Sequence, residues 1–227
     1  FTEDEAGIMA AFKVEHRRLP AGADLFAYGD PATHVFTLYR GWAYRYRLLS
    51  GGRRQILGMV LPGELTGLPG AVAGRHGYAL RTATESEFCV LSLAQLPEVL
   101  RGGQGLPLRL LWLAAHEQRM LERLAVTLGR CSAEEAVAGC ALDLWDRLGR
   151  RGLLDSGGLG FTLPLGQAEI ADHLGMTVVH LNRVLRRMED RGMLRLRRGR
   201  LEILDLEGLK ALTCVLDPED AAPQPFL

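Results

Sequence analysis

Residues 167–194 read QAEIADHLGMTVVHLNRVLRRMEDRGML, a pattern of two short helices joined by a tight turn. Ala171 is the small residue that lets a second helix cross the first, and Gly175 tolerates the positive φ of the turn. Thr177 is a good N-cap for the second helix. Apolar residues at helical spacing would hold both helices on a core: Ile170, Leu174, Met176, Leu181, Val184, Leu185 and Met188. The stretch therefore predicts a helix-turn-helix.

These apolar positions leave a polar and basic face on the second predicted helix. The N-terminal half of such a helix enters the DNA major groove, which is about 12 Å wide. Arg183 suits a guanine and Asn182 an adenine, while Val179 suits a thymine methyl group. We expect the DNA-binding residues to be Thr177, Val179, His180, Asn182, Arg183, Arg186, Arg187 and Arg198.

The next residues, MLRLRRGRLEIL at 193–204, predict two strands around Arg198-Gly199, the wing of a winged helix. Its arginines are candidates for a phosphate clamp: Arg195, Arg197, Arg198 and Arg200. The whole chain is neutral, with 27 basic and 27 acidic residues. Residues 150–200 alone hold ten arginines against five acids, a balance of +5. This local excess indicates an anionic partner that docks at one place.

The sequence from His16 to Leu96 has the pattern of a series of short β-strands. Short apolar runs (HVFTLY, WAYRYRLL, QILGMVL, EFCVLSL) are separated by turn signals at intervals of roughly ten residues, which favours an all-β barrel or double-sheet roll. The alternation of Tyr44 and Tyr46 with Arg45 and Arg47 predicts a strand with one solvated face.

After Pro107 the apolar spacing becomes helical. An apolar stripe on a long helix is typical of paired dimer helices, and its residues are Leu110, Leu113, Met120 and Leu124. The alternative is a helix that packs on its own β-domain. The helix is expected to break at Gly129, and Ser132 with Glu135 has the spacing of a capping box for a further helix.

This order of elements resembles the Crp/Fnr family of bacterial transcription regulators over about His16 to Leu209. LPAGADLFAYGDPATHVFTLYRG at 19–41 resembles the family's opening strands, and LPGEL at 61–65 its Gly-Glu turn. SAEEAVAGCALDLWDRL at 132–148 resembles the start of its DNA-binding domain. The resemblance implies an α+β protein with an N-terminal cyclic-nucleotide-binding-type β-roll (a double-stranded jelly roll), a long dimerisation helix and a C-terminal winged helix-turn-helix.

The expected domain boundaries follow from this order. The β-roll sensor domain occupies residues 1–104 and the dimerisation helix residues 105–130. The winged helix-turn-helix occupies 131–215, and a tail occupies 216–227.

The resemblance also implies partners. A homodimer would place two recognition helices in successive major grooves, about 34 Å apart, on a near-palindromic double-stranded DNA site. The family contacts RNA polymerase and mostly activates transcription. Its recognition helix usually carries Glu-x-x-Ser/Gly-Arg; here the Arg is kept as Arg183 and the Glu is replaced by Val179. This replacement leaves the half-site sequence open.

The resemblance leaves the effector undecided. Cyclic-nucleotide members follow the Gly-Glu turn with an Arg-Ser pair, and here that place holds His76-Gly77 or Tyr78-Ala79. Cyclic AMP is therefore not expected, and weak effector candidates are Gly63, Glu64, Arg75 and Arg81. An iron–sulfur cluster is not expected either, because no cysteine precedes Cys89. A small molecule, a haem held by His34 or His76, and effector-independent control all remain open.

The four cysteines are scattered without CxxC spacing, so we expect reduced thiols and a cytoplasmic protein. Cys131 is either a small buried residue or a redox switch. No apolar run approaches the ~18 residues of a membrane span, so no membrane partner is expected. Because the chain opens with Phe1, we expect residues before it.

Two other functions compete with DNA binding. A cupin-like metal enzyme needs clustered histidines, and the six here are isolated, without HxH or HExxH spacing. The sequence also has no P-loop or GxSxG motif, so we expect no catalytic or metal-binding residues. A winged helix that binds only proteins is the other alternative.

Overall fold

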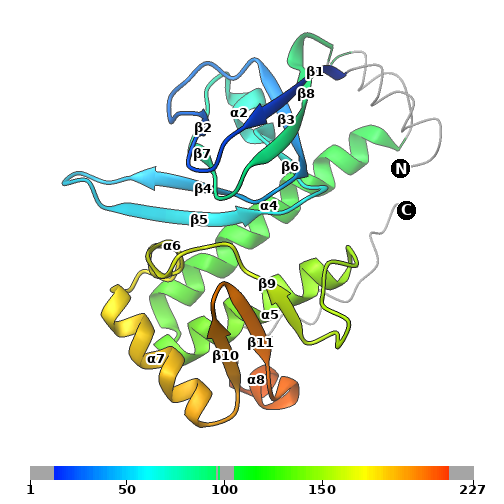
Figure 1. Cartoon of the computed structure of the whole chain (residues 1–227). Coiled ribbons are helices and arrows are strands. Elements are labelled where there is room, and N and C mark those ends of the chain that lie inside the picture. Colours follow the sequence, from blue (N-terminus) through cyan, green and yellow to red (C-terminus); the bar gives the residue numbers. More distant parts are fainter. Residues whose placement is uncertain (1–12, 96, 98–104, 215–227) are drawn as a thin grey trace. The chain divides into compact units, whose positions relative to one another are not determined.

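The structure, a computed structural model, describes residues 13–95, 97 and 105–214 (Figure 1). The chain divides into two compact units. Within the described part, unit 1 holds residues 13–48 and 57–121, and unit 2 holds residues 49–56 and 122–214. The predicted tail, 216–227, lies outside the described residues.

Two four-stranded sheets form a roll, as the spacing of apolar runs predicts, and all of their strands belong to unit 1 except residues 54–56 of β5. The first sheet has the order β1-β8-β3-β6 and the second β2-β7-β4-β5. The strands are β1 (Lys13–Leu19), β2 (Asp24–Phe26), β3 (His34–Arg40), β4 (Ala43–Leu48), β5 (Arg54–Val60), β6 (Leu65–Thr66), β7 (Ala79–Thr82) and β8 (Ser86–Ser92). A short helix α2 (Leu68–Ala73) lies between β6 and β7, and a 3-10 turn η1 (Leu93–Gln95) follows β8.

The core of the roll is built from alternate positions of paired strands. Phe36 pairs with Val90 and Leu38 with Phe88 across the antiparallel β3–β8 ladder, and all four side chains are buried in one cluster. Side chains of alternate residues point to the same face of a strand, so this register places an apolar row inside the roll.

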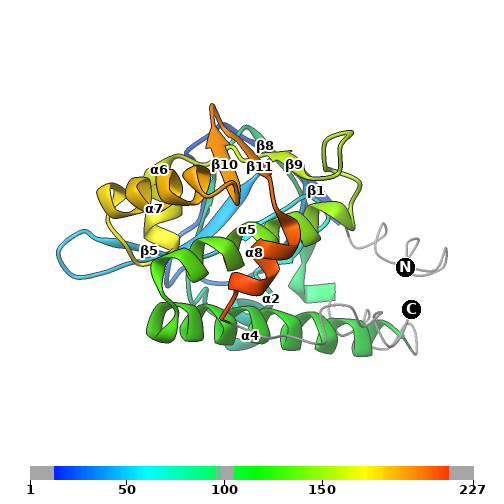
Figure 2. The same cartoon turned by 90° about the horizontal axis from the view of Figure 1, so that it is seen from below.

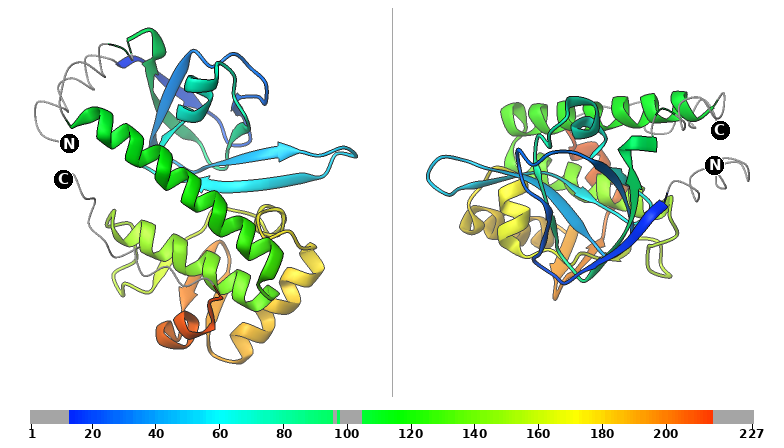
Figure 3. Two further views of the ribbon diagram at one scale, coloured as in Figure 1. Left: turned by 180° about the vertical axis from the view of Figure 1, so that it is seen from behind. Right: turned by 90° about the horizontal axis from the view of Figure 1, so that it is seen from above.

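The helix α4 (Leu106–Arg130) runs unbroken for 25 residues, one residue past the predicted break at Gly129 (Figure 3). Its first part belongs to unit 1 and its last turns to unit 2.

Unit 2 contains the predicted winged helix-turn-helix. Its elements are α5 (Ala133–Gly149), β9 (Gly160–Thr162), α6 (Gln167–His173), α7 (Val178–Asp190), β10 (Leu194–Arg197), β11 (Arg200–Ile203) and α8 (Leu206–Leu212). The three strands form one antiparallel sheet of order β10-β11-β9. The capping box is confirmed: the Ser132 backbone N–H donates to Glu135 at 2.6 Å, and the Glu135 N–H donates to the Ser132 hydroxyl at 3.3 Å. Figure 2 shows α8 beside α5, the helix against which it packs.

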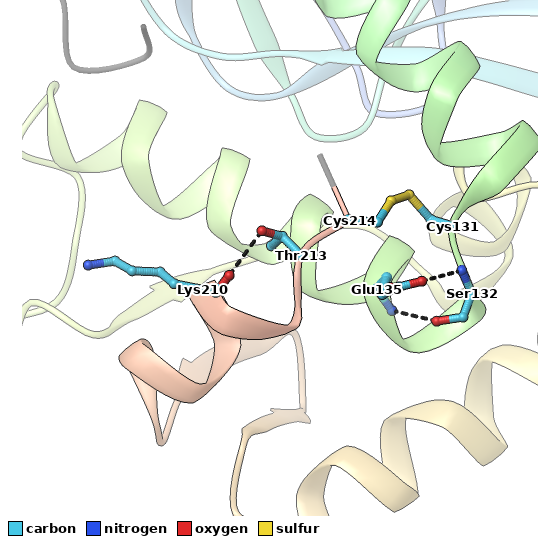
Figure 4. The surroundings of a disulfide bond; sticks show 6 residues. All are labelled: Cys131, Ser132, Glu135, Lys210, Thr213 and Cys214. Carbon is cyan, nitrogen blue, oxygen red and sulfur yellow. Dashed lines mark hydrogen bonds between the residues drawn. A yellow bond between two sulfur atoms is a disulfide. The ribbon is translucent and has the colours of Figure 1, made fainter. Parts of the chain in front are cut away.

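The sequence analysis expected four reduced cysteines, whereas the structure joins two of them. Cys131, between α4 and α5, is joined to Cys214, just after α8, by a disulfide (Figure 4). Sequence spacing could not reveal this pairing, because 83 positions separate the two cysteines and only the fold brings them together. Cys89 and Cys140 are free thiols.

Candidate nucleic-acid interface

The helix-turn-helix is held by the residues that the sequence pattern singles out. Ala171 is almost fully buried where α6 meets α7, and Leu181 and Val184 of α7 are fully buried. Gly175 has a φ of 63°, which is a left-handed conformation. Glycine adopts it readily, whereas a residue with a Cβ atom would be destabilised there. The backbone N–H of Met176 donates to the carbonyl of Ala171 at 3.1 Å and closes the turn.

The start of α7 is fixed by Thr177. Its hydroxyl oxygen accepts a hydrogen bond from the His180 backbone N–H at 3.1 Å, as an N-cap does. Thr177 and His180 are both exposed, so the positively polarised N-terminus of α7 faces solvent.

The outer face of α7 forms a shallow depression open to solvent. Its lining residues are Val179, Asn182, Arg183, Arg186, Arg187 and Asp190. Five of these six residues were predicted to bind DNA, so the structure brings together the base-reading and phosphate-binding candidates of this helix.

The arginines of this face differ in their partners. Arg187 and Arg191 both bind the carboxylate of Glu134 in the first turn of α5, at 3.1 Å and 2.7 Å. Arg183 and Arg186 are exposed and make no ion pair with any residue of the described chain. The positive charge of these two guanidinium groups is therefore available to an anionic partner.

The predicted wing is present as the β10–β11 hairpin, which is part of the sheet of unit 2. Strand β10 of this hairpin contacts α7 (Figure 1). Arg198 and Gly199 form its turn with φ of 52° and 72°, so both adopt the left-handed conformation of a type I′ turn. Arg198 is the only non-glycine residue with positive φ in the described ranges.

The wing arginines do not all form a free phosphate clamp. Arg195 and Arg197 bind Glu189 at 2.9 Å and 2.6 Å, and Arg200 binds Asp155 at 2.7 Å. Arg198 is exposed and has no ion-pair partner among the residues described. Sequence spacing gives no sign of this difference, because the acidic partners lie on α7 and on the loop before β9.

The residues of the roll that were weakly predicted to bind an effector contact other groups of the protein itself. Gly63 and Glu64 form the turn between β5 and β6, where the Glu64 carboxylate accepts from the Leu61 backbone N–H at 3.0 Å. Arg75 donates to the Gly29 carbonyl at 2.7 Å. Arg81 binds both carboxylate oxygens of Asp24, at 2.8 and 2.7 Å, and this contact raises the pKa of the Arg81 guanidinium.

An ion pair that the sequence analysis missed lies in unit 1. Arg45 on β4 binds Glu117 on α4, and both side chains are nearly buried. The alternation of β4 predicted Arg45 on a solvated face, which is wrong: its exposed fraction is 8%. Gly58 on β5 makes room for it, since a Cβ atom there would lie 2.9 Å from a guanidinium nitrogen. The guanidinium carbon lies 5.7 Å from the centre of the Tyr78 ring.

Tyr78 belongs to one of the two residue pairs, His76-Gly77 and Tyr78-Ala79, that the resemblance offers for the phosphate-binding place. Its buried hydroxyl lies 3.1 Å from the Thr66 hydroxyl and accepts from the Gly67 backbone N–H at 3.0 Å. Burial raises the pKa of the Tyr78 hydroxyl, so this group stays neutral. The phenol of Tyr78 therefore engages a backbone N–H and a hydroxyl group inside the roll.

The two haem candidates lie in different surroundings. Nδ1 of His34 lies 2.9 Å from the Thr33 hydroxyl. His76 is buried and stacks on Phe26, with ring centres 3.7 Å apart. Burial lowers the pKa of His76, so its imidazole is neutral in the folded roll. No group of three or more His, Cys, Asp and Glu side chains suited to a metal ion occurs among the described residues.

The apolar stripe proposed for dimerisation is largely covered by this chain itself. Leu110 and Leu113 pack against the roll's own cluster of Val35, Leu68 and Leu91, and Leu124 is also buried. Met120 is half-buried. The alternative of packing on the β-domain therefore holds for Leu110 and Leu113.

Another stripe of α4 is exposed. Its residues are Leu108, Leu111, Ala115, Gln118, Glu122 and Ala125. They recur at alternating intervals of three and four, the spacing of a helix that pairs with a second helix. None of the described helices has the length and apolar character required to cross a membrane.

Comparison with known proteins agrees with this architecture. A family model for a cyclic nucleotide-binding domain matches residues 16–102, and one for a Crp-like helix-turn-helix domain matches residues 109–212. The chain is 31% identical over 192 residues to the nitrogen fixation regulation protein FixK of Rhizobium meliloti, covering 84% of this chain and 83% of FixK. It is 30% identical to the transcriptional activatory protein AadR of Rhodopseudomonas palustris, covering 90% of this chain and 79% of AadR.

Among solved structures, FixK2 from Bradyrhizobium japonicum superposes with a TM-score of 0.79 at 25% identity, covering 89% of this chain and 98% of that one. The fold and these relatives define a DNA-binding transcription regulator with a helix-turn-helix. The chain belongs to the Crp/Fnr family, with an N-terminal cyclic nucleotide-binding-type domain and a C-terminal Crp-like helix-turn-helix.

Proposed function

We propose that the chain is a homodimeric, sequence-specific regulator that acts in the cytoplasm and binds a near-palindromic duplex through α7 and the wing. The observation that carries this proposal is the exposed face of α7, where Arg183 and Arg186 have no carboxylate partner among the described residues. In this proposal Arg183 reads a guanine, with Val179, His180 and Asn182 beside it. Arg186 and Arg198 contact phosphates, as does Arg187, which also pairs with Glu134. The hydroxyl proton of Thr177 remains available to donate to a phosphate.

The proposed dimer forms along α4, but through a different stripe from the one that the sequence suggested. Leu110 and Leu113 support unit 1, so they are not free to pair with a second copy. Leu108, Leu111, Ala115 and Ala125 face solvent at coiled-coil spacing and are the residues that we propose at the dimer contact. RNA polymerase is the proposed protein partner, as in the family.

We further propose that the roll does not bind cyclic AMP. Neither pair offered for the phosphate-binding place, His76-Gly77 or Tyr78-Ala79, contains an arginine. Arg75 and Arg81 are held by Gly29 and Asp24. Effector-independent control, or an effector other than a cyclic nucleotide, is the proposal that remains. The cupin-like enzyme finds no support among the relatives, which are named as regulators.

Duplex binding measured against salt concentration tests the proposal. The duplex is one enriched by the protein itself from a random-sequence library. We expect affinity to fall steeply with salt, because each neutralised phosphate releases counterion. Arg183→Ala is expected to lower affinity by about 1–3 kcal/mol and to relax base preference at one position of each half-site.

The matched control is Arg18→Ala, which removes an exposed arginine of β1 that binds Glu87 at 3.1 Å. This variant should leave both affinity and base preference unchanged. If no library sequence is enriched, or if Arg183→Ala binds every sequence like the parent protein, α7 does not read DNA.

A further inference from the structure

The disulfide between Cys131 and Cys214 links the two ends of the DNA-binding part of the chain (Figure 4). Cys131 directly precedes Ser132, the N-cap of α5, and Cys214 directly follows Thr213, the C-cap of α8. Their Cα atoms lie 5.9 Å apart, within the range of about 4.4–6.8 Å usual for a disulfide. The backbone therefore holds the two cysteines at bonding distance.

We propose that Cys131 and Cys214 form a reversible thiol–disulfide site, exchanged with low-molecular-weight thiols, whose oxidised form binds DNA more tightly than its reduced form. The coupling to DNA rests on the proposed function. The exchange itself is a property of the two cysteines alone.

Accessibility favours exchange at this pair, and burial disfavours thiol reactivity at Cys140. Cys214 is exposed and Cys131 is half-buried, so a small thiolate can reach a sulfur of the bond. Burial raises the pKa of the Cys140 thiol to about 12, which suppresses its thiolate. Duplex DNA lies in the reducing interior of a cell, where exposed protein disulfides are mostly transient and redox-sensing. A permanently oxidised pair is therefore not the expected state.

The exchange proceeds in two balanced steps. A small thiolate attacks Sγ of Cys214, the S–S bond breaks, and the Cys131 thiolate leaves and takes up a proton. A second small thiolate attacks the small-molecule sulfur of the mixed disulfide and releases the Cys214 thiolate, which is also protonated. The protein gains two electrons and two protons, and two small thiols become one small disulfide. The reverse reaction uses that small disulfide as the oxidant.

The position of the bond connects it to the DNA-binding face. Cys131 lies three residues before Glu134, the carboxylate that binds Arg187 and Arg191 of α7. At the other end, α8 packs against α5, and the Thr213 hydroxyl donates to the Lys210 carbonyl at 3.0 Å at the end of α8. The oxidised bond fixes the start of α5 to the end of α8. A unit held in its binding conformation loses less conformational entropy on binding, so the oxidised form should bind DNA more tightly.

The first experiment measures the exchange without DNA. The full chain is equilibrated with mixtures of reduced and oxidised glutathione, quenched in acid, and alkylated under denaturing conditions for mass spectrometry. We expect two alkylated cysteines, Cys89 and Cys140, in oxidising mixtures and all four in reducing mixtures. A pair that stays bonded in every mixture, or that never bonds, would overturn the proposal.

The second experiment measures duplex binding of both redox forms, with the library enrichment performed once in each state. We expect the oxidised form to bind about tenfold more tightly. Cys214→Ser, and separately Cys131→Ser with Cys214→Ser, should abolish the difference, and Cys89→Ser should retain it. Equal dissociation constants for the two wild-type forms would overturn the coupling. If neither form binds any duplex, both the proposed function and the coupling are overturned. The alkylation experiment then still shows whether the two cysteines exchange with small thiols.

Discussion

The side-chain amide of Asn182 in α7 donates a hydrogen bond of 2.9 Å to the side-chain oxygen of Gln167, the first residue of α6. Both side chains are exposed, so this contact orients a proposed base-reading amide without burying it. A polar side chain held in one orientation discriminates between bases better than one that rotates freely.

We predict that Gln167→Ala weakens base discrimination at the position read by Asn182 by about 1 kcal/mol, the usual contribution of one hydrogen bond. The salt dependence should stay unchanged, because the substitution removes no charge. Binding to single-base-pair variants of the enriched duplex measures both effects. In a double-mutant cycle with Asn182→Ala the two losses should not add, and additive losses would show that Gln167 does not act through Asn182.

The turn of the wing supports a second prediction. Arg198 has a φ of 52° at the first central position of a type I′ turn, where asparagine is preferred over a long side chain. Arg198→Asn should raise the free energy of unfolding by up to about 1 kcal/mol, since it relieves a left-handed conformation. The same substitution should weaken binding similarly for all duplex sequences and reduce the salt slope by about 0.9, because one phosphate contact is lost.

Thermal unfolding and salt-dependent binding measure these two effects separately. Arg198→Lys is the matched control, since it keeps the charge and the strained backbone, and should bind nearly as the parent protein does. An Arg198→Asn protein that is more stable and binds DNA with full affinity would exclude the wing tip from the interface.

The helix-turn-helix and the capping box of α5 could be predicted from sequence because they are local. Ala171, Gly175 and Thr177 are each required by contacts within a few residues along the chain. Partners distant in sequence could not be predicted in this way. The pairing of Arg200 with Asp155 and of Cys131 with Cys214 depends on segments that only the folded unit brings together.

The same limit explains the error at β4. Alternation along a strand identifies two faces, but Tyr44 and Tyr46 on one face and Arg45 on the other are all buried. Arg45 lies on the face that contributes to the inside of the roll, where Glu117 from α4 supplies the opposite charge and Gly58 the space. Neither partner belongs to the strand itself, so the sequence of β4 contains no signal for the burial of Arg45.

The Arg45–Glu117 pair supports a third prediction, about stability. Counted for the side chains alone, the exposed fractions of Arg45 and Glu117 are 10% and 14%, so removing one partner leaves a nearly buried, uncompensated charge. Arg45→Met alone or Glu117→Leu alone should lower the free energy of unfolding of unit 1 by about 3–5 kcal/mol. The double variant should lie within about 1–2 kcal/mol of the parent, because both charges are then absent.

Urea unfolding followed by tryptophan fluorescence measures these differences. The control is Arg18→Met, which removes an exposed ion pair. It should lower the free energy of unfolding by less than about 1 kcal/mol. If the double variant is as unstable as the sum of the two single variants, the pair contributes nothing as a pair.

The exposed stripe of α4 supports the last prediction. Leu111 has an exposed fraction of 66% and lies on the same face as Ala115, one helical turn further on. If this stripe pairs with a second copy, Leu111→Glu with Ala115→Glu places like charges directly against each other and should produce folded monomers. Leu113→Glu should instead destabilise unit 1, because Leu113 packs on the core of the roll. Sedimentation velocity gives the oligomeric state, and circular dichroism verifies folding.

Val72→Glu is the control, since Val72 on α2 is 81% exposed and lies outside the stripe, and this variant should remain dimeric. The monomeric double variant should also lose most of its affinity for the full near-palindromic duplex while still binding a half-site weakly, because one recognition helix then acts without its partner. Dimers that persist in the Leu111→Glu and Ala115→Glu protein would place the self-association surface elsewhere on the chain.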